Sequence, residues 1–429
     1  MRRVPTAILI VAAALIVAAA AHAVDPAQAA AAPAPVPVPE PSALALRWYR
    51  TGIIVWFAGL LWGIAVPALV FASGLSARLA AWAKQLSTRF FFATAIYALL
   101  YTGLIFLLGL PFDWYATFFR PHAYALSNQT VAKWFSDALV SLALGGGVAA
   151  VLLWLPYLLL SRTPRLWWLW LSLLCVPFIC FVLVVEPVWV APLYNHFGPM
   201  KDASLERQIL GLAERAGIEG GRVFEVEKSV DTKTLNAYVN GLGATKRIVL
   251  WDTLLAKLAP DEVLAVMAHE MGHYVLNHVL LSIPVLSLGI LVCLYATHRT
   301  APWILRRFGA RAGVLELRDM ASFPLVLLLV QLYGFLLAPF GYALSRHLEH
   351  EADRFSLEIT RDNHAMASAL AKLQTNNLSN PWPARWWVWL HYTHPPLGER
   401  IDFANHYRPW ASGEPLRYAR HFRDEGTVR

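Results

Sequence analysis

The chain contains few cysteines and few charged residues. Its three cysteines, Cys175, Cys180 and Cys293, all lie in apolar stretches, which excludes a disulfide framework and a cysteine-based metal site. Only 15% of the 429 residues are charged, whereas a soluble domain carries roughly 25%. This shortage of charge excludes an ordinary soluble protein and a disordered chain.

Long apolar runs replace the missing charge, and hydrophobic residues make up 57% of the sequence. Each run has about 19 to 24 residues, enough for a helix to cross a hydrocarbon layer of about 30 Å. Core helices of a large soluble protein do not account for so many uncharged runs. The sequence therefore predicts an α-helical multi-pass membrane protein that contacts membrane lipids. The six runs are Thr51–Phe71, Phe90–Leu110, Ala138–Leu160, Leu166–Val185, Val279–Thr297 and Ala321–Leu344.

The charges that are present do not indicate nucleic acid or transport. The net charge is +8, but membrane proteins accumulate Lys and Arg in their cytoplasmic loops, so we expect no nucleic-acid partner. The six apolar runs contain no ionisable residue that could carry a substrate or a proton, which argues against a transporter.

The N-terminal segment has the pattern of a secretory signal peptide, with Arg2 and Arg3 before an apolar run and small residues at Ala21 and Ala23. Alternatively, residues 1–23 remain as an uncleaved first membrane anchor, which raises the span count from six to seven. A proline-rich linker is expected at 24–49, four transmembrane helices at 50–185 and two more at 279–344. Between and after these helices lie two polar segments, 186–278 and 345–429.

The first polar segment has the pattern of a small mixed α/β unit. Apolar residues at helical spacing, from Leu205 to Ala216, predict an amphipathic helix that Gly217 ends. Residues 222–227 and 245–251 read as strands, and residues 236–241 as an edge strand or a turn.

The same segment ends in the pattern His269-Glu270-x-x-His273, on a predicted helix that begins near Pro260. Histidines four residues apart share one helix face, so both rings can reach one tetrahedral Zn²⁺. Glu270, beside them, can take a proton from a water molecule on that metal. The pattern predicts one catalytic zinc ion per chain, with 186–278 as a catalytic segment.

A catalytic zinc site needs a third protein ligand. His278 does not fit the extended pattern H-E-x-x-H-x-x-G-x-x-H, because its glycine and its spacing are missing here. We therefore expect that the chain does not turn back to present His278 to the metal. His278 is then a polar residue at the membrane boundary. The segment after the last apolar run offers Glu349 and Asp353, four apart on one helix face, while Glu351 points elsewhere. Glu349 can bind the metal, and Asp353 can orient a ligand histidine or transfer a proton. The alternative is that these acids form only a solvated helix face.

Six blocks of the sequence resemble, in order and spacing, the integral-membrane CAAX prenyl protease type I family. The blocks are Val190–Phe197, Asn236–Tyr238, Lys246–Leu255, His269–His278, Ser345–Phe355 and His391–Arg400. The resemblance implies six or seven transmembrane helices around a chamber, with a zincin-like HExxH helix and a small β-sheet at one membrane face. Unlike some members of that family, this chain lacks a long charged insertion before the zinc helix.

The resemblance also implies the roles of individual residues. It implies a zinc metalloendopeptidase with metal ligands His269, His273 and Glu349, the base Glu270 and the assisting acid Asp353. The family pattern further matches His394 and Arg400, which lie near the zinc in that family, and Asn236, where an extended substrate would be held.

We therefore expect a zinc-dependent endopeptidase that cleaves membrane-associated or lipid-modified, CAAX-like polypeptides. An extended substrate would add a strand near Asn236 and Tyr238, and His394 would stabilise the oxyanion, unless it only caps a helix. Two alternatives remain: a membrane-protein quality-control protease without lipid recognition, and a non-enzymatic multi-pass protein with a structural zinc.

The short loops predict the orientation in the membrane. The loops after the first, third and fifth apolar runs contain ten Lys and Arg residues, and the short segments on the opposite side contain four. Because positive residues stay in the cytoplasm, the two polar segments are expected on the exported side. For a bacterial inner membrane, this places the active site toward the periplasm.

Overall fold

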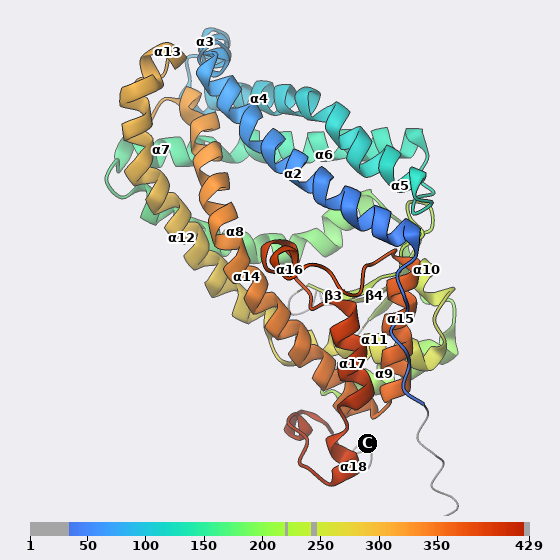
Figure 1. Cartoon of the computed structure of the whole chain (residues 1–429). Coiled ribbons are helices and arrows are strands. Elements are labelled where there is room, and N and C mark those ends of the chain that lie inside the picture. The colour runs from blue at the N-terminus through green and yellow to red at the C-terminus, as the bar shows by residue number, and fades with distance from the viewer. Residues whose placement is uncertain (1–33, 219–221, 242–246, 424–429) are drawn as a thin grey trace, which may run out of the picture. The chain divides into compact units, whose positions relative to one another are not determined.

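The computed structural model describes residues 34–218, 222–241 and 247–423. Within these residues, six helical segments are long and apolar enough to cross a membrane (Figure 1). Each coincides with one of the six predicted runs, so this prediction is confirmed. The predicted signal peptide or first anchor, residues 1–23, lies outside the described residues. The six segments are Ala43–Ala72, Phe90–Ala123, Val131–Arg162, Trp167–Leu193, His278–Ala312 and Met320–Thr360.

Three of these segments, the second, fourth and fifth, contain a short π-helix. The α-helices that build the six segments are α2 (Ala43–Ala72), α4 (Phe90–Asp113), α5 (Arg120–Ala123), α6 (Val131–Leu152), α7 (Trp154–Arg162), α8 (Trp167–Val185), α12 (His278–Ile304), α13 (Ala310–Ala312) and α14 (Phe323–Thr360). Helix α2 begins at Ala43 because the Ser42 hydroxyl accepts the Ala45 N–H at 3.1 Å. A short amphipathic helix, α3 (Leu75–Leu86), follows it.

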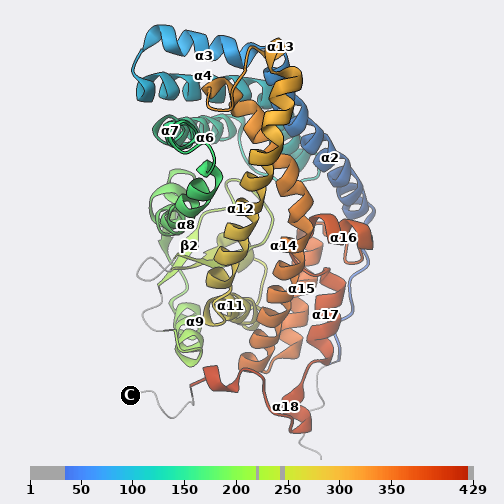
Figure 2. The same ribbon diagram turned by 90° about the vertical axis from the view of Figure 1, so that its left-hand side faces the viewer.

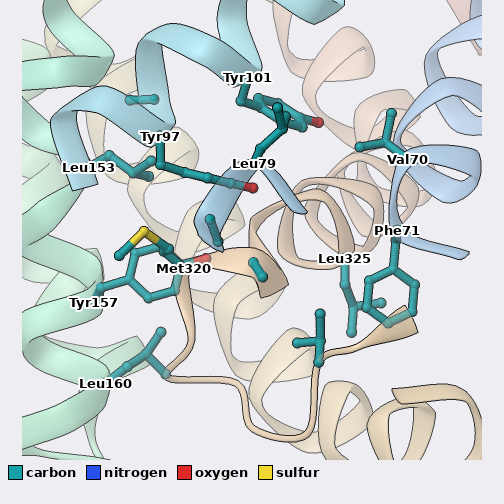
Figure 3. Packing of buried hydrophobic residues seen from close by; sticks show 14 of the residues in the cluster. Val70, Phe71, Leu79, Tyr97, Tyr101, Leu153, Tyr157, Leu160, Met320 and Leu325 are labelled. Carbon is teal, nitrogen blue, oxygen red and sulfur yellow. The ribbon is translucent and has the colours of Figure 1, made fainter. Parts of the chain in front are cut away.

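The spans expose large apolar side chains along most of their length. Leu69, Leu107 and Phe340 are each about two-thirds exposed or more, as expected for side chains that face lipid. The largest buried core of the spans lies where α2, α3, α4, α7 and α14 converge, and it also includes residues of α8 and α12 (Figure 3). Polar groups connect this core: the hydroxyl of Ser76 lies 2.7 Å from that of Tyr97 and donates to the Ala321 carbonyl. This core is therefore the rigid part of the membrane region.

The first polar segment, residues 186–278, forms a four-stranded mixed sheet in the order β1-β2-β4-β3. Strands β2 and β4 are parallel, and both outer pairs are antiparallel. The strands predicted at 222–227, 236–241 and 245–251 are present, and β3 lies at an edge of the sheet. The bounds are β1 (Phe197–Pro199), β2 (Val223–Val226), β3 (Ala237–Asn240) and β4 (Arg247–Trp251).

Helices pack against this sheet and against the end of α14. They are α9 (Ala203–Arg215), α10 (Asp252–Leu255), α11 (Pro260–Val275), α15 (Asn363–Asn376), α16 (Arg385–His391), α17 (Leu397–His406) and α18 (Pro409–Ser412). The second apolar core lies between the sheet, α9 and α11, and it includes Phe355 of α14. The long helix α14 thus runs without a break from the membrane region to this second core (Figure 2).

Helix α11 packs across α14, and Gly272 lies at their contact. A Cβ at this position would lie 3.1 Å from the Phe355 Cβ and 3.2 Å from the Ala352 Cα. Because these neighbours include backbone, the crossing depends on the absence of a side chain. The close approach brings the histidines of α11 opposite the acids of α14.

Candidate metal centre

Three side chains from two helices meet at the crossing of α11 and α14. His269 and His273 come from α11, and Glu349 comes from α14. The two Nε2 atoms lie 3.2 Å apart, and Glu349 places its carboxylate oxygens 3.2 Å from the Nε2 of His269 and 3.3 Å from that of His273. The structure thus brings the three predicted metal ligands together.

These separations fit a shared zinc ion. In a tetrahedral site with metal bonds of about 2.0–2.1 Å, the ligand atoms lie about 3.3 Å from one another. The Oε2 atom of Glu349 is buried and accepts no hydrogen bond from the described residues, which is unfavourable for a carboxylate unless a cation neutralises it. Two imidazoles and one carboxylate leave a fourth position free, as a catalytic zinc site requires.

A carboxylate behind the cluster holds one of its rings. Asp353 is 1% exposed, and its carboxylate lies 2.8 Å from the Nδ1 of His269, the nitrogen that faces away from the cluster. Burial lowers the pKa of His269, but the neighbouring carboxylates of Asp353 and Glu349 outweigh it and raise the pKa to about 10. Asp353 thus fixes the ring orientation and makes the imidazole a stronger donor toward a metal.

Arg400, from α17, neutralises that carboxylate. Its guanidinium donates two hydrogen bonds to Asp353, at 2.6 and 2.8 Å. Burial lowers the pKa of Arg400, but the attraction of Asp353 outweighs it and raises the pKa, so the guanidinium stays charged. Because Asp353 is held between Arg400 and His269, the geometry favours the orienting role considered above over a role in proton transfer.

Glu270 lies next to the cluster and faces the edge of the sheet. Burial raises the pKa of its carboxyl group, and the positive charge of His269 and His273 opposes this effect. The nearby backbone N–H of Val239 in β3 also opposes the rise in pKa. A carboxylate with a raised pKa, held beside a metal site, is suited to accept a proton near neutral pH.

His278 lies closer to the cluster than the sequence analysis predicted. It is 5% exposed, and its Nδ1 lies 2.9 Å from the Nδ1 of His273. Asn277 adopts a left-handed conformation with φ +57° between α11 and α12, and this turn brings the His278 ring to His273 without making it part of the three-residue cluster. His278 stands at the start of the fifth span, outside the metal cluster, and contacts the ring of a proposed ligand.

His394 approaches the cluster from the loop between α16 and α17. Its Nε2 lies 3.3 Å from the Oε1 of Glu349, and its side chain is about half exposed. Its Nδ1 lies 2.8 Å from the hydroxyl of the neighbouring Thr393. The ring therefore stands at the open side of the cluster, where a bound substrate could reach it.

Asn236 and Tyr238 lie at β3. The carbonyl of Asn236 accepts the Trp251 N–H at 3.2 Å, while Asn236 itself lines a pocket that also reaches His394 and Arg400. Tyr238 pairs with Val249 of β4, and burial raises its pKa to about 12, so its hydroxyl stays protonated. Among the described residues, β3 pairs only with β4, which leaves its other edge available.

Glu351 belongs to a different group of contacts. Its carboxylate accepts hydrogen bonds from Arg354 and Tyr418 and lies 3.1 Å from Arg417. Two of these partners come from the C-terminal segment, which also reaches the buried Glu358 through the Tyr418 N–H at 2.7 Å. These contacts attach the end of the chain to α14 and do not reach the metal cluster.

Comparison with known proteins places most of the chain in two family models. Residues 199–408 match the family model described as "Peptidase family M48". Residues 52–196 match the one described as "CAAX prenyl protease N-terminal, five membrane helices". The first match contains the metal cluster, and the second contains four of the six candidate spans.

Individual relatives agree with these matches. The uncharacterized metalloprotease YhfN of Bacillus subtilis is 35% identical over 78% of this chain and 79% of that protein. CAAX prenyl protease 1 of Saccharomyces cerevisiae is 28% identical over 70% of each chain. The crystal structure of S. mikatae Ste24p superimposes with a TM-score of 0.71 at 23% identity, covering 83% of this chain and 87% of that one. At this identity the likeness establishes the fold alone.

Proposed function

The chain belongs to peptidase family M48, and on that premise we propose that it is a zinc-dependent endopeptidase of the membrane that cleaves extended, membrane-associated or lipid-modified polypeptides. The observation that carries the proposal is the set of separations among His269, His273 and Glu349, at 3.2–3.3 Å, with Glu270 beside them. When bound there, zinc would polarise the scissile carbonyl and acidify a water molecule.

The residues around the metal position have separate tasks in this proposal. Glu270 accepts the proton of the attacking water and later transfers it to the leaving amine. His394, at the open side, donates a hydrogen bond to the developing oxyanion. Asp353 and Arg400 keep the His269 ring in place, so they act on the reaction only through that ligand.

The free edge of β3 is the proposed binding site for the substrate backbone. Helix α11, which carries Glu270, packs against β3, and this packing supports a substrate position beside the metal centre. A polypeptide that adds to β3 as a further strand would pass directly in front of Glu270. Recognition by main-chain hydrogen bonds suits an enzyme that accepts varied side chains.

A relative supports the proposal that the substrate is lipid-modified. The yeast relative is a CAAX prenyl protease 1 by name, and an open pocket of about 650 Å³ lies between α4, α6 and α14 of this chain. The B. subtilis relative is named only as a metalloprotease. It therefore supports a second candidate, a membrane-protein quality-control protease without lipid recognition.

The test combines metal analysis with peptide cleavage. We expect that Glu270→Gln retains zinc but loses about 10²- to 10⁴-fold in cleavage rate, because Gln cannot accept the proton. Glu214→Gln, at an exposed position on α9, is the matched control and should leave both unchanged. Full cleavage by zinc-loaded Glu270→Gln would exclude the proposed mechanism. Equal rates for prenylated and unprenylated CAAX peptides would favour the second candidate.

A further inference from the structure

A pocket of about 690 Å³ connects the metal centre with the membrane region. His394, Arg400 and Asn236 line it on the side of the metal centre. On the opposite side it is lined by Trp48 and Arg120, from α2 and α5. The pocket therefore extends from the proposed cleavage position to the end of two spans.

Arg120 is the unusual residue in this pocket. It is 8% exposed, and its guanidinium lies 3.4 Å from the centre of the Trp48 ring. It donates to the Trp48 carbonyl at 2.6 Å and to the Thr51 hydroxyl, while its Nη1 atom donates to no acceptor within the described residues. No carboxylate of the described ranges forms an ion pair with it, and a buried charge at the end of a span is costly without one.

The surrounding residues maintain space for this guanidinium. A Cβ on Gly52 would lie 3.2 Å from the Nη2 atom of Arg120, so a side chain there would press on the charged group. The second arginine of the pocket, Arg400, already forms a two-hydrogen-bond ion pair with Asp353. Arg120 is thus the arginine of this pocket that is left for an external anion.

The direction of the substrate strand indicates which anion this is. Antiparallel pairing is the commoner arrangement at a sheet edge. A strand antiparallel to β3 would place its carboxyl end beside the amino end of β3. Leu235 and Asn236, at that amino end, line the pocket. The part of the polypeptide that follows the scissile bond therefore enters the pocket that contains Arg120.

We propose that Arg120 binds the C-terminal carboxylate of the polypeptide substrate and is therefore a specificity-determining residue of this site. This inference rests on the proposed function, because it takes the substrate to be a strand added to β3. A guanidinium is suited to this task, since it can pair with a carboxylate through two parallel hydrogen bonds. The aromatic walls of the pocket, from Trp56, Trp387 and Tyr392, would contact apolar side chains that precede that carboxylate.

The experiment compares two fluorescein-labelled decapeptides of identical apolar sequence, one ending in a free carboxylate and the other in an amide. Binding is measured by anisotropy with zinc-loaded Glu270→Gln protein, and cleavage with the unmodified enzyme. We expect the acid peptide to bind and react about 10- to 100-fold better, as for a charge-assisted ion pair. Arg120→Gln should remove this preference by weakening only the acid peptide. Arg120→Lys should retain part of it.

Controls separate recognition from folding and from catalysis. Arg50→Gln, an exposed arginine on α2, should keep the full preference, and thermal unfolding of each variant reports its stability. Equal binding of both peptides to the Glu270→Gln protein, or an equal loss of both in Arg120→Gln, would overturn the proposal. The preference for the acid peptide could also disappear in nanodiscs of phosphatidylglycerol and persist in nanodiscs of phosphatidylcholine. That result would overturn the proposal and assign Arg120 to a lipid phosphate. If the protein binds the acid peptide preferentially but the unmodified enzyme cleaves neither peptide, the proposed function is contradicted and the role of Arg120 in binding is not.

Discussion

At the scale of single residues, neighbouring acids on one helix have different surroundings. Glu349 faces two imidazoles, Asp353 lies between a ligand ring and a guanidinium, and Glu351 contacts the C-terminal segment. Helical spacing explains the division, because residues four apart share a face and a residue two positions away points elsewhere. Each carboxylate is buried, so its partner determines its role.

This division leads to a prediction for the metal. Glu349→Ala should lose zinc, because two imidazoles alone hold it too weakly, whereas Glu351→Ala should retain it. The second substitution leaves the charges of Arg354 and Arg417 near each other, so it should lower the free energy of unfolding by about 1–3 kcal/mol. The measurement is metal content of folded protein in detergent, with thermal unfolding alongside. Equal zinc loss in both variants would contradict this ligand choice.

The contact between His278 and His273 leads to a second prediction. His278 contacts the Nδ1 of His273, the ring nitrogen that does not face the metal cluster, and can therefore hold the His273 ring in the orientation for metal binding. Loss of such a partner lowers metal affinity about 10- to 100-fold. We expect this loss for His278→Phe, which keeps an aromatic ring but removes its nitrogens, and partial recovery for His278→Gln. Competition with a zinc chelator measures the affinity. Unchanged zinc affinity in His278→Phe would show that the contact is only a packing contact.

At the scale of elements, the crossing of α11 and α14 sets the metal geometry. Gly272→Ala places a methyl group against Phe355 and Ala352, so the helices must separate by a few tenths of an ångström. We expect a loss of about 1–3 kcal/mol in stability, together with weaker zinc binding, because His269 and Glu349 are attached to opposite helices. Gly211→Ala on α9, where a Cβ meets no atom within 4 Å, is the control. Zinc affinity equal to that of the control would mean that the crossing tolerates the shift.

The elements that could be predicted are those with a periodic or compositional signal. The six spans follow from uncharged runs, and Glu349 follows from its spacing to Asp353 and from the family pattern. Strand β1 was not predicted, because its three residues, Phe-Gly-Pro, have no strand pattern and are held by pairing with β2. The contact of His278 depends on the left-handed Asn277, and the position of Arg120 depends on the packing of distant spans. Neither has a signal in the local sequence.

At the scale of the whole membrane region, the loops divide between two ends. Lys84 and Asp319 form an ion pair at 3.2 Å, which brings the loop after the first span to the segment before the sixth. The indole of Trp167 donates to His298 at 3.1 Å, so the start of the fourth span lies beside the fifth. The bridge between Ser127 and Thr232 lies at the other end, against the catalytic segment. The loops that were counted together from the sequence therefore belong to the same end.

This arrangement sharpens the prediction of orientation. The end of the membrane region away from the metal centre has ten Lys and Arg residues in its loops, and the end near the metal centre has four in its short segments. Because positive residues stay in the cytoplasm, the end with ten should be cytoplasmic. The metal centre should then face the exported side. A reporter that is active only after export, fused after Arg429 of the full chain, should be active, and a cytoplasm-dependent reporter at the same position should be silent. An epitope inserted between Gly313 and Glu316 is the internal control and should be protected from protease in intact cells. Exposure of that epitope, with a silent export reporter, would place the catalytic segment in the cytoplasm. The substrates would then have to be polypeptides that never leave it.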